Sequence, residues 1–496
     1  MSFILSIDQG TTGTTSALID TKTFKFVGKV GQEYPQIYPK PSWVEHNLND
    51  IWETTQNTIV QVLKKCNASP ADIVGIGLTN QRETTCAFSK NGEPLYNAIV
   101  WQDRRTSSFC EQITQSGDAK EITQKTGLPV DPYFSASKMK WLLDNSDKVK
   151  RHANNGDLRF GTIDTFLLYK LSGHRSHFTE SSNASRTLLM NIESGQWDQE
   201  LCRYFGIDPN FLPEIKDSFS DFGQTSSLSF LPDGIPIYGI LGDQQSALFG
   251  QACYKKGSLK CTYGTGAFML ANTGKELKRS EHGLLTTVAY QYKNELFYAL
   301  EGSCYIAGAA VQWLRDNLKF FPESSDIEAM AKKVANLNEM ENVLFLPFFS
   351  GLGSPYWKSE AKGAIIGLTR DTHQGHIARA CLDGIALSIH DLLASMTKDF
   401  GEHIAEMKVD GGAVNNNLLM EIQASVSKLK VIRPEVIETT AYGAALACAI
   451  GSGHIDFDGI KELWKEDRTF EPINNLTPFY ETKYHQWENA IKRLYL

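Results

Sequence analysis

One local pattern occurs twice in this chain, and it restricts the possible folds more than any other feature of the sequence. Near residue 10, an apolar segment at 3–7 leads into Asp8-Gln9-Gly10-Thr11-Thr12-Gly13, and a second apolar segment follows. Near residue 264, a similar segment at 259–263 leads into Gly264-Thr265-Gly266, again followed by a strand-like segment. A strand, a turn rich in glycine and threonine, and another strand therefore predict two similarly built halves. Because strands and helices alternate after each turn, we expect an α/β fold.

The length of 496 residues is too great for a single hydrophobic core, so we expect at least two domains. The two similar halves meet near Gly250. We therefore predict an N-terminal domain at 1–251 and a C-terminal domain at 252–496. The sequence has no linker rich in proline, glycine or serine at this point, so the boundary depends on the repeated pattern.

The composition is typical of a cytoplasmic globular protein. The formal net charge of −8 disfavours a nucleic-acid-binding protein, which usually carries a basic face. The longest apolar stretch, near 444–450, is too short to span a membrane. The nine cysteines are dispersed and form no Cys-x-x-Cys pair, which is typical of reduced thiols. We therefore expect neither nucleic acid nor a membrane as a partner.

Both glycine- and threonine-rich turns are suited to holding phosphate. Glycine lets the backbone approach a phosphate closely, and threonine hydroxyls and backbone N–H groups donate hydrogen bonds to its oxygens. Asp8 lies at the end of a strand, where its carboxylate can hold Mg²⁺, usually through water. An ordinary hairpin turn has a similar composition. The second turn favours phosphate binding, because two facing loops can hold one triphosphate between them.

A third segment, Val409-Asp410-Gly411-Gly412-Ala413, ends an apolar strand and precedes a helix that starts near Asn416. Its glycines allow an adenine ring to lie flat against the backbone. The sequence has no Gly-x-x-x-x-Gly-Lys loop and no protein-kinase signature. The three segments together resemble the actin-like ATPases, which include sugar kinases, hexokinases, heat-shock chaperones and actin. That resemblance implies two ribonuclease-H-like domains flanking a catalytic cleft.

Candidate substrate-binding residues follow a predicted strand at 73–78. Arg82 offers hydrogen-bond donors and the adjacent Glu83 offers acceptors, so together they can fix two hydroxyl groups of a polyol. The alternative is an exposed surface ion pair. Trp101 and Phe268 can enclose a short carbon chain between them, although either aromatic taken singly is more often a core residue.

Asp243 follows the apolar segment 237–241 and a glycine, where a carboxylate can face a cleft. By its residue type alone, Asp243 is better suited to capping a helix that begins near Gln245. Its catalytic interpretation therefore depends on the resemblance described next.

Seven segments spread over nearly the whole chain closely resemble the glycerol kinases, a group within the carbohydrate-kinase family that also includes xylulose, gluconate and fucose kinases. The segments are Asn80-Gln81-Arg82-Glu83-Thr84-Thr85, Ala98-Ile99-Val100-Trp101-Gln102, Asp131-Pro132-Tyr133-Phe134-Ser135, Asn183-Ala184-Ser185-Arg186-Thr187, Gly242-Asp243-Gln244-Gln245, Tyr263-Gly264-Thr265-Gly266 and Asp410-Gly411-Gly412-Ala413-Val414. Within the family, the adjacent Arg82 and Glu83 separate the glycerol kinases from the sugar kinases.

The resemblance implies that ATP phosphorylates glycerol to sn-glycerol 3-phosphate in a cytoplasmic enzyme, with Mg²⁺ as cofactor and Asp243 as general base. Because relatives are usually dimers or larger, a homodimer is expected. Glycerol contacts are implied for Arg82, Glu83, Trp101, Tyr133, Asp243, Gln244 and Phe268. Nucleotide contacts are implied for Thr11, Thr12, Gly13, Thr265, Gly308, Gln312, Gly412 and Asn416. Metal contacts are implied for Asp8 and Asp243.

This chain departs from the glycerol-kinase pattern in the first loop. Relatives commonly have serine at the position of Gly13 and arginine at the position of Thr15. Losing that cation is expected to weaken nucleotide binding or lower the rate. Two alternative functions remain, a related sugar or polyol kinase and an actin-like ATPase without a small-molecule acceptor. Arg82, Glu83 and Trp101 disfavour the first, and their combination with Asp243 disfavours the second.

Overall fold

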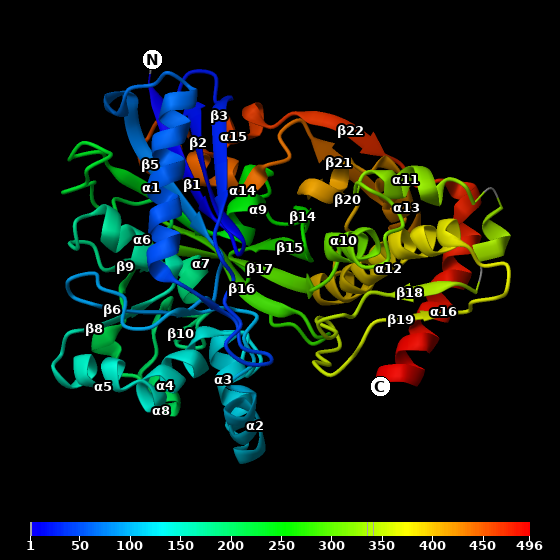
Figure 1. Ribbon diagram of the computed structural model, residues 1–496, viewed down its shortest axis with the longest axis horizontal. Helices are drawn as coiled ribbons and strands as arrows, with labels where there is room; N and C mark the ends of the chain where they lie inside the picture. Colours follow the sequence, from blue (N-terminus) through cyan, green and yellow to red (C-terminus); the bar gives the residue numbers. More distant parts are fainter. Residues whose placement is uncertain (1, 335, 341) are drawn as a thin grey trace.

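The computed structural model describes residues 2–334, 336–340 and 342–496, and two mixed β-sheets organise it (Figure 1). The first sheet has five strands, in the spatial order β13 (Ile237–Gly242), β5 (Ile73–Asn80), β1 (Phe3–Gln9), β2 (Gly13–Asp20) and β3 (Phe26–Glu33). The second has seven strands, in the order β16 (Leu285–Tyr292), β17 (Glu295–Cys304), β15 (Ala267–Gly274), β14 (Leu259–Tyr263), β20 (Glu406–Asp410), β21 (Lys430–Pro434) and β22 (Glu466–Phe470).

The two sheets are built in the same way. In the first, β1, β2 and β3 are antiparallel neighbours, and β5 and then β13 extend the sheet in parallel from β1. In the second, β14, β15 and β17 are the antiparallel neighbours, and β20 and then β21 extend the sheet in parallel from β14. The prediction of two similarly built halves is therefore confirmed. In each half, the glycine- and threonine-rich turn connects the first two strands.

Helices cover the sheets and connect their strands. The longer ones are α1 (Leu48–Lys65), α2 (Ser107–Ser116), α3 (Ala119–Thr126), α4 (Ser135–Asn145), α5 (Asp147–Asn154), α6 (Ile163–Leu171), α8 (Gln199–Phe205), α9 (Asp243–Gly250), α10 (Gly308–Asp316), α12 (Gln374–Phe400), α13 (Asn417–Ser427), α14 (Thr439–Gly451), α15 (Phe457–Leu463) and α16 (Thr477–Tyr495). Shorter elements include α7 (Ser181–Ala184), α11 (Asp326–Ala331), β6 (Cys86–Ser89), β7 (Ala98–Ile99) and β8 (Leu158–Gly161). Among the described helices, none is both long enough and apolar enough to cross a membrane.

One helix from the C-terminal half covers the first sheet. α14 packs against β13, β5 and β1, and Figure 1 shows it, in orange, beside these N-terminal strands. The contact is close because the strands carry glycine where the helix crosses them. A Cβ atom on Gly77 would lie 2.0 Å from the carbonyl oxygen of Ala444, and one on Gly239 would lie 2.5 Å from Ala447 C. The division of the chain at residue 251 stays a prediction, and α14 packs across that division.

The buried carboxyl group of Asp391, on α12, should make stability depend on pH. Burial raises the pKa of Asp391 from 3.8 to about 7, although Trp487 Nε1 (2.8 Å) and Tyr484 OH (2.9 Å) donate hydrogen bonds to it. Between these two pKa values, the folded protein retains a proton that the unfolded chain has released. The free energy of unfolding should therefore fall as the pH rises from about 4 to about 7, with Asp391 contributing at most about 1.4 kcal/mol per pH unit.

Urea unfolding at several pH values tests this expectation. Asp391→Asn stays uncharged throughout the range, so its free energy of unfolding should fall less steeply with pH than that of the wild type. Equal slopes for the two proteins would contradict the assignment.

Candidate active site

The first glycine- and threonine-rich loop follows β1 and is held by two buried residues, Tyr34 and Gln81. Tyr34 OH donates to the carbonyl oxygen of Gly10 (2.6 Å), and Gln81 N donates to the carbonyl oxygen of Gln9 (2.7 Å). Trp101 Nε1 also donates to Thr11 Oγ1 (2.9 Å). The loop is therefore held at Gln9, Gly10 and Thr11 by three separate residues.

The second loop follows β14 and is joined to the start of α10. Gly264 N donates to the carbonyl oxygen of Gly266 (2.8 Å), which closes the turn, and Gly308 N donates to that of Gly264 (3.0 Å). A Cβ atom on Gly266 would lie 2.6 Å from the carbonyl oxygen of Cys304, so only glycine fits this approach. As a result, the beginning of α10 and the second loop are packed together as one unit.

A cavity of about 330 Å³ lies between the two loops. Its lining comes from both halves of the chain and mixes aromatic faces with polar groups. Trp101 stands at 87° to Tyr133 and at 80° to Phe268, with ring centroids 5.6 and 6.4 Å away. The lining residues are Thr11, Thr12, Gln36, Tyr38, Arg82, Glu83, Trp101, Gln102, Tyr133, Asp243, Gln244, Thr262, Gly264, Thr265, Gly266, Phe268 and Tyr305. A cavity of this size and mixed lining suits a small polar molecule with a short carbon chain.

Two further cavities adjoin the first. One, of about 410 Å³, shares Gly264 and Thr265 with it and extends between α10 and α13. The other, of about 530 Å³, shares Thr262 with the first cavity and Gly412 with the second, and it is lined by Asp8. The loops after β14 and β20 therefore stand where the three cavities meet.

Arg82 and Glu83 occupy a tight turn at the end of β5. Thr84 N donates to the carbonyl oxygen of Arg82 (2.7 Å), and Glu83 between them has a φ of 60°, a left-handed conformation that is rare for a residue with a side chain. Arg82 and Glu83 are 2% and 1% exposed, so the alternative of a surface ion pair is wrong. Strained backbone of this kind is concentrated at functional sites, where surrounding contacts maintain it.

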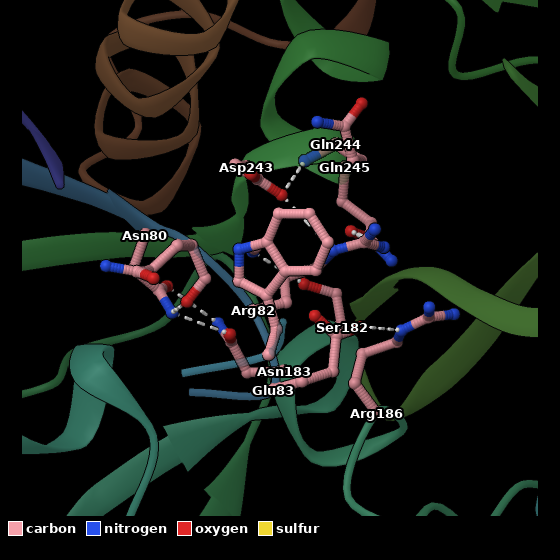
Figure 2. Close-up of polar contacts among 12 residues, drawn as sticks. Asn80, Arg82, Glu83, Ser182, Asn183, Arg186, Asp243, Gln244 and Gln245 are labelled. Carbon is pink, nitrogen blue, oxygen red and sulfur yellow. Dashed lines mark hydrogen bonds and ion pairs between the residues drawn. The ribbon is translucent and has the colours of Figure 1, made fainter. Parts of the chain in front are cut away.

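Buried charges continue from this turn in an alternating series, of which Figure 2 shows Arg82, Glu83, Arg186 and Asp243. Glu83 Oε1 accepts from Arg186 Nε (2.6 Å), and Arg186 Nη2 donates to Glu301 Oε1 (3.1 Å). Glu301 also receives both terminal nitrogens of Arg82, at 2.6 and 2.9 Å. Arg82 Nε then lies 3.2 Å from Asp243 Oδ1. Glu301, on the second sheet, thus holds two arginines from the N-terminal half, one beside Glu83 and one beside Asp243.

The arginine-bearing segments are also held by neutral contacts. Asn80 and Asn183 exchange two amide hydrogen bonds, at 3.0 and 3.1 Å, which fix the start of the Arg186 segment to the end of β5. A Cβ atom on Gly242 would lie 2.6 Å from Arg82 Cδ, so the glycine before Asp243 makes room for the Arg82 side chain.

Burial and neighbouring charges shift the pKa values of the carboxyl groups in different directions. Burial opposes ionisation of Glu301, but Arg186 and Arg82 outweigh it and lower its pKa to about 2. Burial raises the pKa of Asp243, although Arg82 and then Lys260 oppose the rise. Burial and then the nearby Asp243 raise the pKa of Asp8 to about 7. Asp8 and Asp243 therefore repel each other, and a cation beside them would relieve that repulsion.

The structure brings together nearly all of the site residues that the sequence predicts. Every predicted glycerol contact lines the 330 Å³ cavity, as do Thr11, Thr12 and Thr265. The remaining predicted nucleotide contacts that line the 410 Å³ cavity are Gly308, Gln312, Gly412 and Asn416. Gly13 differs, because it begins β2 and a Cβ atom there would lie 2.7 Å from the carbonyl oxygen of Gln32. Its need for glycine comes from strand packing.

Asp243 is the first residue of α9, and Gly242 takes the capping position. Its Oδ1 accepts from the adjacent Gln244 N (2.7 Å), so the helix start orients the carboxylate. The expected helix start near Gln245 is therefore two residues too late. A carboxylate in the first turn of a helix is stabilised by the helix dipole, and here it also lines the cavity.

Reasoning from the sequence missed several residues of the site, among them Glu301, Lys260, Tyr38 and Tyr305. Glu301 and Lys260 are buried charges within otherwise apolar strand segments. A charge in such a segment could have indicated a buried ion pair, because charged residues are rarely buried unless they are paired. Tyr38 and Tyr305 carry no comparable signal, since each lies outside the recognised motifs.

The donor set fits a magnesium ion held mainly by a bound triphosphate. Asp8 and Asp243 supply carboxylate oxygens, which Mg²⁺ prefers. Asp8 lines the 530 Å³ cavity, and Asp243 lines the adjoining 330 Å³ cavity together with the threonines of both loops. Within the described part of the chain, no three His, Cys, Asp or Glu side chains are grouped to hold a metal ion. Phosphate oxygens and water would therefore complete the coordination.

The chain belongs to the FGGY family of carbohydrate kinases. Residues 3–250 match the N-terminal domain of that family and residues 259–452 match its C-terminal domain. The expected two-domain, actin-like architecture is thereby confirmed. A gluconate kinase from Lactobacillus acidophilus, 20% identical and covering 99% of this chain and 98% of its own, has this fold with a TM-score of 0.87.

Proteins named glycerol kinase are among the relatives with similar sequences. Those from Bdellovibrio bacteriovorus and Myxococcus xanthus are each 47% identical over 99% of both chains. The solved structure of Plasmodium falciparum glycerol kinase with ADP is 35% identical, covers 100% of this chain and 99% of its own, and has a TM-score of 0.89.

Proposed function

We propose that this chain uses ATP to phosphorylate glycerol to sn-glycerol 3-phosphate, with Asp243 as general base and Mg-ATP bound between the two halves. The observation that carries the proposal is the shared cavity of Arg82, Glu83 and Asp243. A donor, an acceptor and a base meet there beside the aromatic faces of Trp101 and Phe268. The similarity to the glycerol kinases supports the choice of substrate.

The buried charges explain how the substrate would be held. Arg82 and Glu83 are each fixed by other side chains, so both reach the cavity in a set orientation. A polyol offers neighbouring hydroxyls that can accept from the guanidinium and donate to the carboxylate. Because these partners are already positioned, binding requires little further ordering of the protein.

Asp243 has the chemistry required of the base. Phosphoryl transfer needs positioning and charge stabilisation, together with a group that accepts the proton of the attacking hydroxyl. Burial raises the pKa of Asp243, which makes its carboxylate a stronger proton acceptor, while Arg82 and Lys260 favour the ionised form that can act as a base. Bound Mg²⁺ would supply positive charge to the transferred phosphoryl group. Thr11, Thr12 and Thr265 would donate hydrogen bonds to the phosphates from the two loops.

Coupled ADP release with Mg-ATP, measured with and without glycerol, tests the function. We expect turnover that depends on glycerol and exceeds turnover with xylulose or gluconate. Preference for one of those sugars would assign the chain to a different substrate within the family. ATP hydrolysis that is indifferent to every acceptor would indicate an ATPase.

Gly412 offers a test of the nucleotide site. A Cβ atom on Gly412 would meet no other atom within 4 Å, and the residue lines two of the three cavities, so a larger side chain would project into the cleft. Gly412→Val should raise KM for ATP about 10- to 100-fold, which corresponds to roughly 1–3 kcal/mol of steric conflict. Its thermal stability should match the wild type. Gly459→Ala, in α15, is the control, and an unchanged KM for ATP in Gly412→Val would contradict the assignment.

A further inference from the structure

A lysine that lines none of the three cavities is buried beside them. Lys260, the second residue of β14, is 0% exposed. Side chains alternate along this strand, so Leu259, Cys261 and Tyr263 pack into the core of the C-terminal half, while Lys260 and Thr262 face α9 and the seam between the halves. Burying an ammonium group is costly unless it is paired, so its contacts identify what it does.

The ammonium group of Lys260 has two hydrogen-bond partners, and both side chains line the cavities. Nζ donates to Gln244 Oε1 (2.7 Å) and to Thr262 Oγ1 (2.8 Å). The carboxylates of Asp410, Asp243 and Glu301 lie near enough to favour the charged form, while burial lowers the pKa of the lysine. Lys260 is therefore placed among three acidic side chains, of which Asp243 lines the 330 Å³ cavity and Asp410 lines the 530 Å³ cavity.

The contact with Gln244 fixes which end of that amide faces the cavity. An ammonium group only donates hydrogen bonds, so the atom of Gln244 that faces it must be the oxygen. The Nε2 group then points away from Lys260, and among the described residues it has no hydrogen-bond partner. Gln244 lines the 330 Å³ cavity, so its free donor is available to a ligand there.

We infer that Lys260 is a positioning residue for substrate binding, because it orients the Gln244 amide so that Nε2 donates to an oxygen of the bound polyol. This inference rests on the proposed function. The Gln244 amide becomes a third oriented polar group beside Arg82 and Glu83, and orienting it is the role of the buried lysine. Lys260 itself does not touch the substrate and acts through Gln244.

A double-mutant cycle tests the inference. Lys260→Met removes the donor but keeps a long side chain, and Gln244→Met removes the amide. Each should raise KM for glycerol about tenfold or more, the loss expected when a hydrogen bond to a buried group is removed. KM for ATP should stay within about threefold. Because Lys260 acts through Gln244, the double variant should be no worse than Gln244→Met. Effects that multiply in the double variant would overturn the inference.

Lys483→Met is the matched control for removing a buried lysine. Lys483 is 1% exposed and donates to the backbone oxygens of Met340 (2.7 Å) and Val343 (3.1 Å), away from all three cavities. It should lose stability without a change in KM for glycerol. An equal rise in KM in this control would mean that Lys260→Met acts by loosening the fold, and the inference would be withdrawn.

Gln244→Glu tests the same inference by a second route if Lys260→Met does not fold. Glutamate keeps an oxygen for Lys260 and replaces the Nε2 donor by an acceptor, so KM for glycerol should rise about as much as in Gln244→Met. A KM near the wild-type value would show that the substrate uses the oxygen, which overturns the inference. Wild-type protein without glycerol-dependent turnover would instead refute the proposed function, and the cycle would then be run on the acceptor that the wild type prefers.

Discussion

Replacing Asp243 by asparagine should lower kcat for phosphoryl transfer about 10²- to 10⁴-fold, the usual contribution of a general base. Asparagine keeps an oxygen that can accept from Gln244 N, so the start of α9 should be preserved. It cannot accept the proton of the attacking hydroxyl at neutral pH. The fall should therefore appear in kcat, with a smaller change in KM for glycerol.

The measurement is coupled ADP release, with ADP binding by calorimetry as the control for an intact nucleotide site. Because Asp243 also approaches Asp8, the variant should be assayed over a range of Mg²⁺ concentrations. A residual rate within tenfold of the wild type at saturating Mg²⁺ would rule out Asp243 as the base.

Replacing Glu301 by glutamine should cost about 3–5 kcal/mol of stability, because it leaves two buried guanidinium groups without their shared carboxylate. Glu301 is 0% exposed and receives both Arg82 and Arg186. Arg82 and Glu83 would lose their fixed orientation with it, so KM for glycerol should rise strongly in the protein that still folds.

Strand β17 contains its own control for this prediction. Glu295, at the other end of the strand, makes an exposed ion pair with Lys275 (2.7 Å). Glu295→Gln is the same substitution in the same strand, and it should change stability little, since surface ion pairs contribute little. Urea unfolding of both variants decides the matter, and equal losses would mean that the Glu301 network does not hold the site together.

The sequence predicted most of the fold because its strongest signals are local. The two loops, at Gly10 and Gly264, follow apolar strands, and the glycines and threonines have the same structural use in both. Asn47 and Asp50 are both residue types that cap helices, and α1 begins at Leu48 rather than after Asp50, because the Asn47 side chain accepts from Asn49 N (2.9 Å). Such small shifts arise where several neighbouring residues can all act as caps.

The candidate site was harder to predict, because its charges are paired over long distances in the sequence. Arg82 stands beside Glu83 in the chain, which suggested that the two act as a pair. In the structure, however, Arg82 pairs with Glu301 and Glu83 pairs with Arg186. Pairings across 219 and 103 residues cannot be inferred from spacing. The homodimer and the assigned role of each site residue stay predictions.

The position of α14 has a consequence for how the chain folds during synthesis. The first sheet has all of its strands once Gly242 has been made, but α14 begins only at Thr439, so residues 243–438 must be made in between. At about 5–20 residues per second, the ribosome needs roughly 10–40 s to make that stretch. Throughout this time the apolar face around Ile4, Ala17 and Leu241 lacks its covering helix. A nascent chain with an uncovered sheet face is prone to aggregate, so this protein should depend on chaperones until the last part of its C-terminal half has been made.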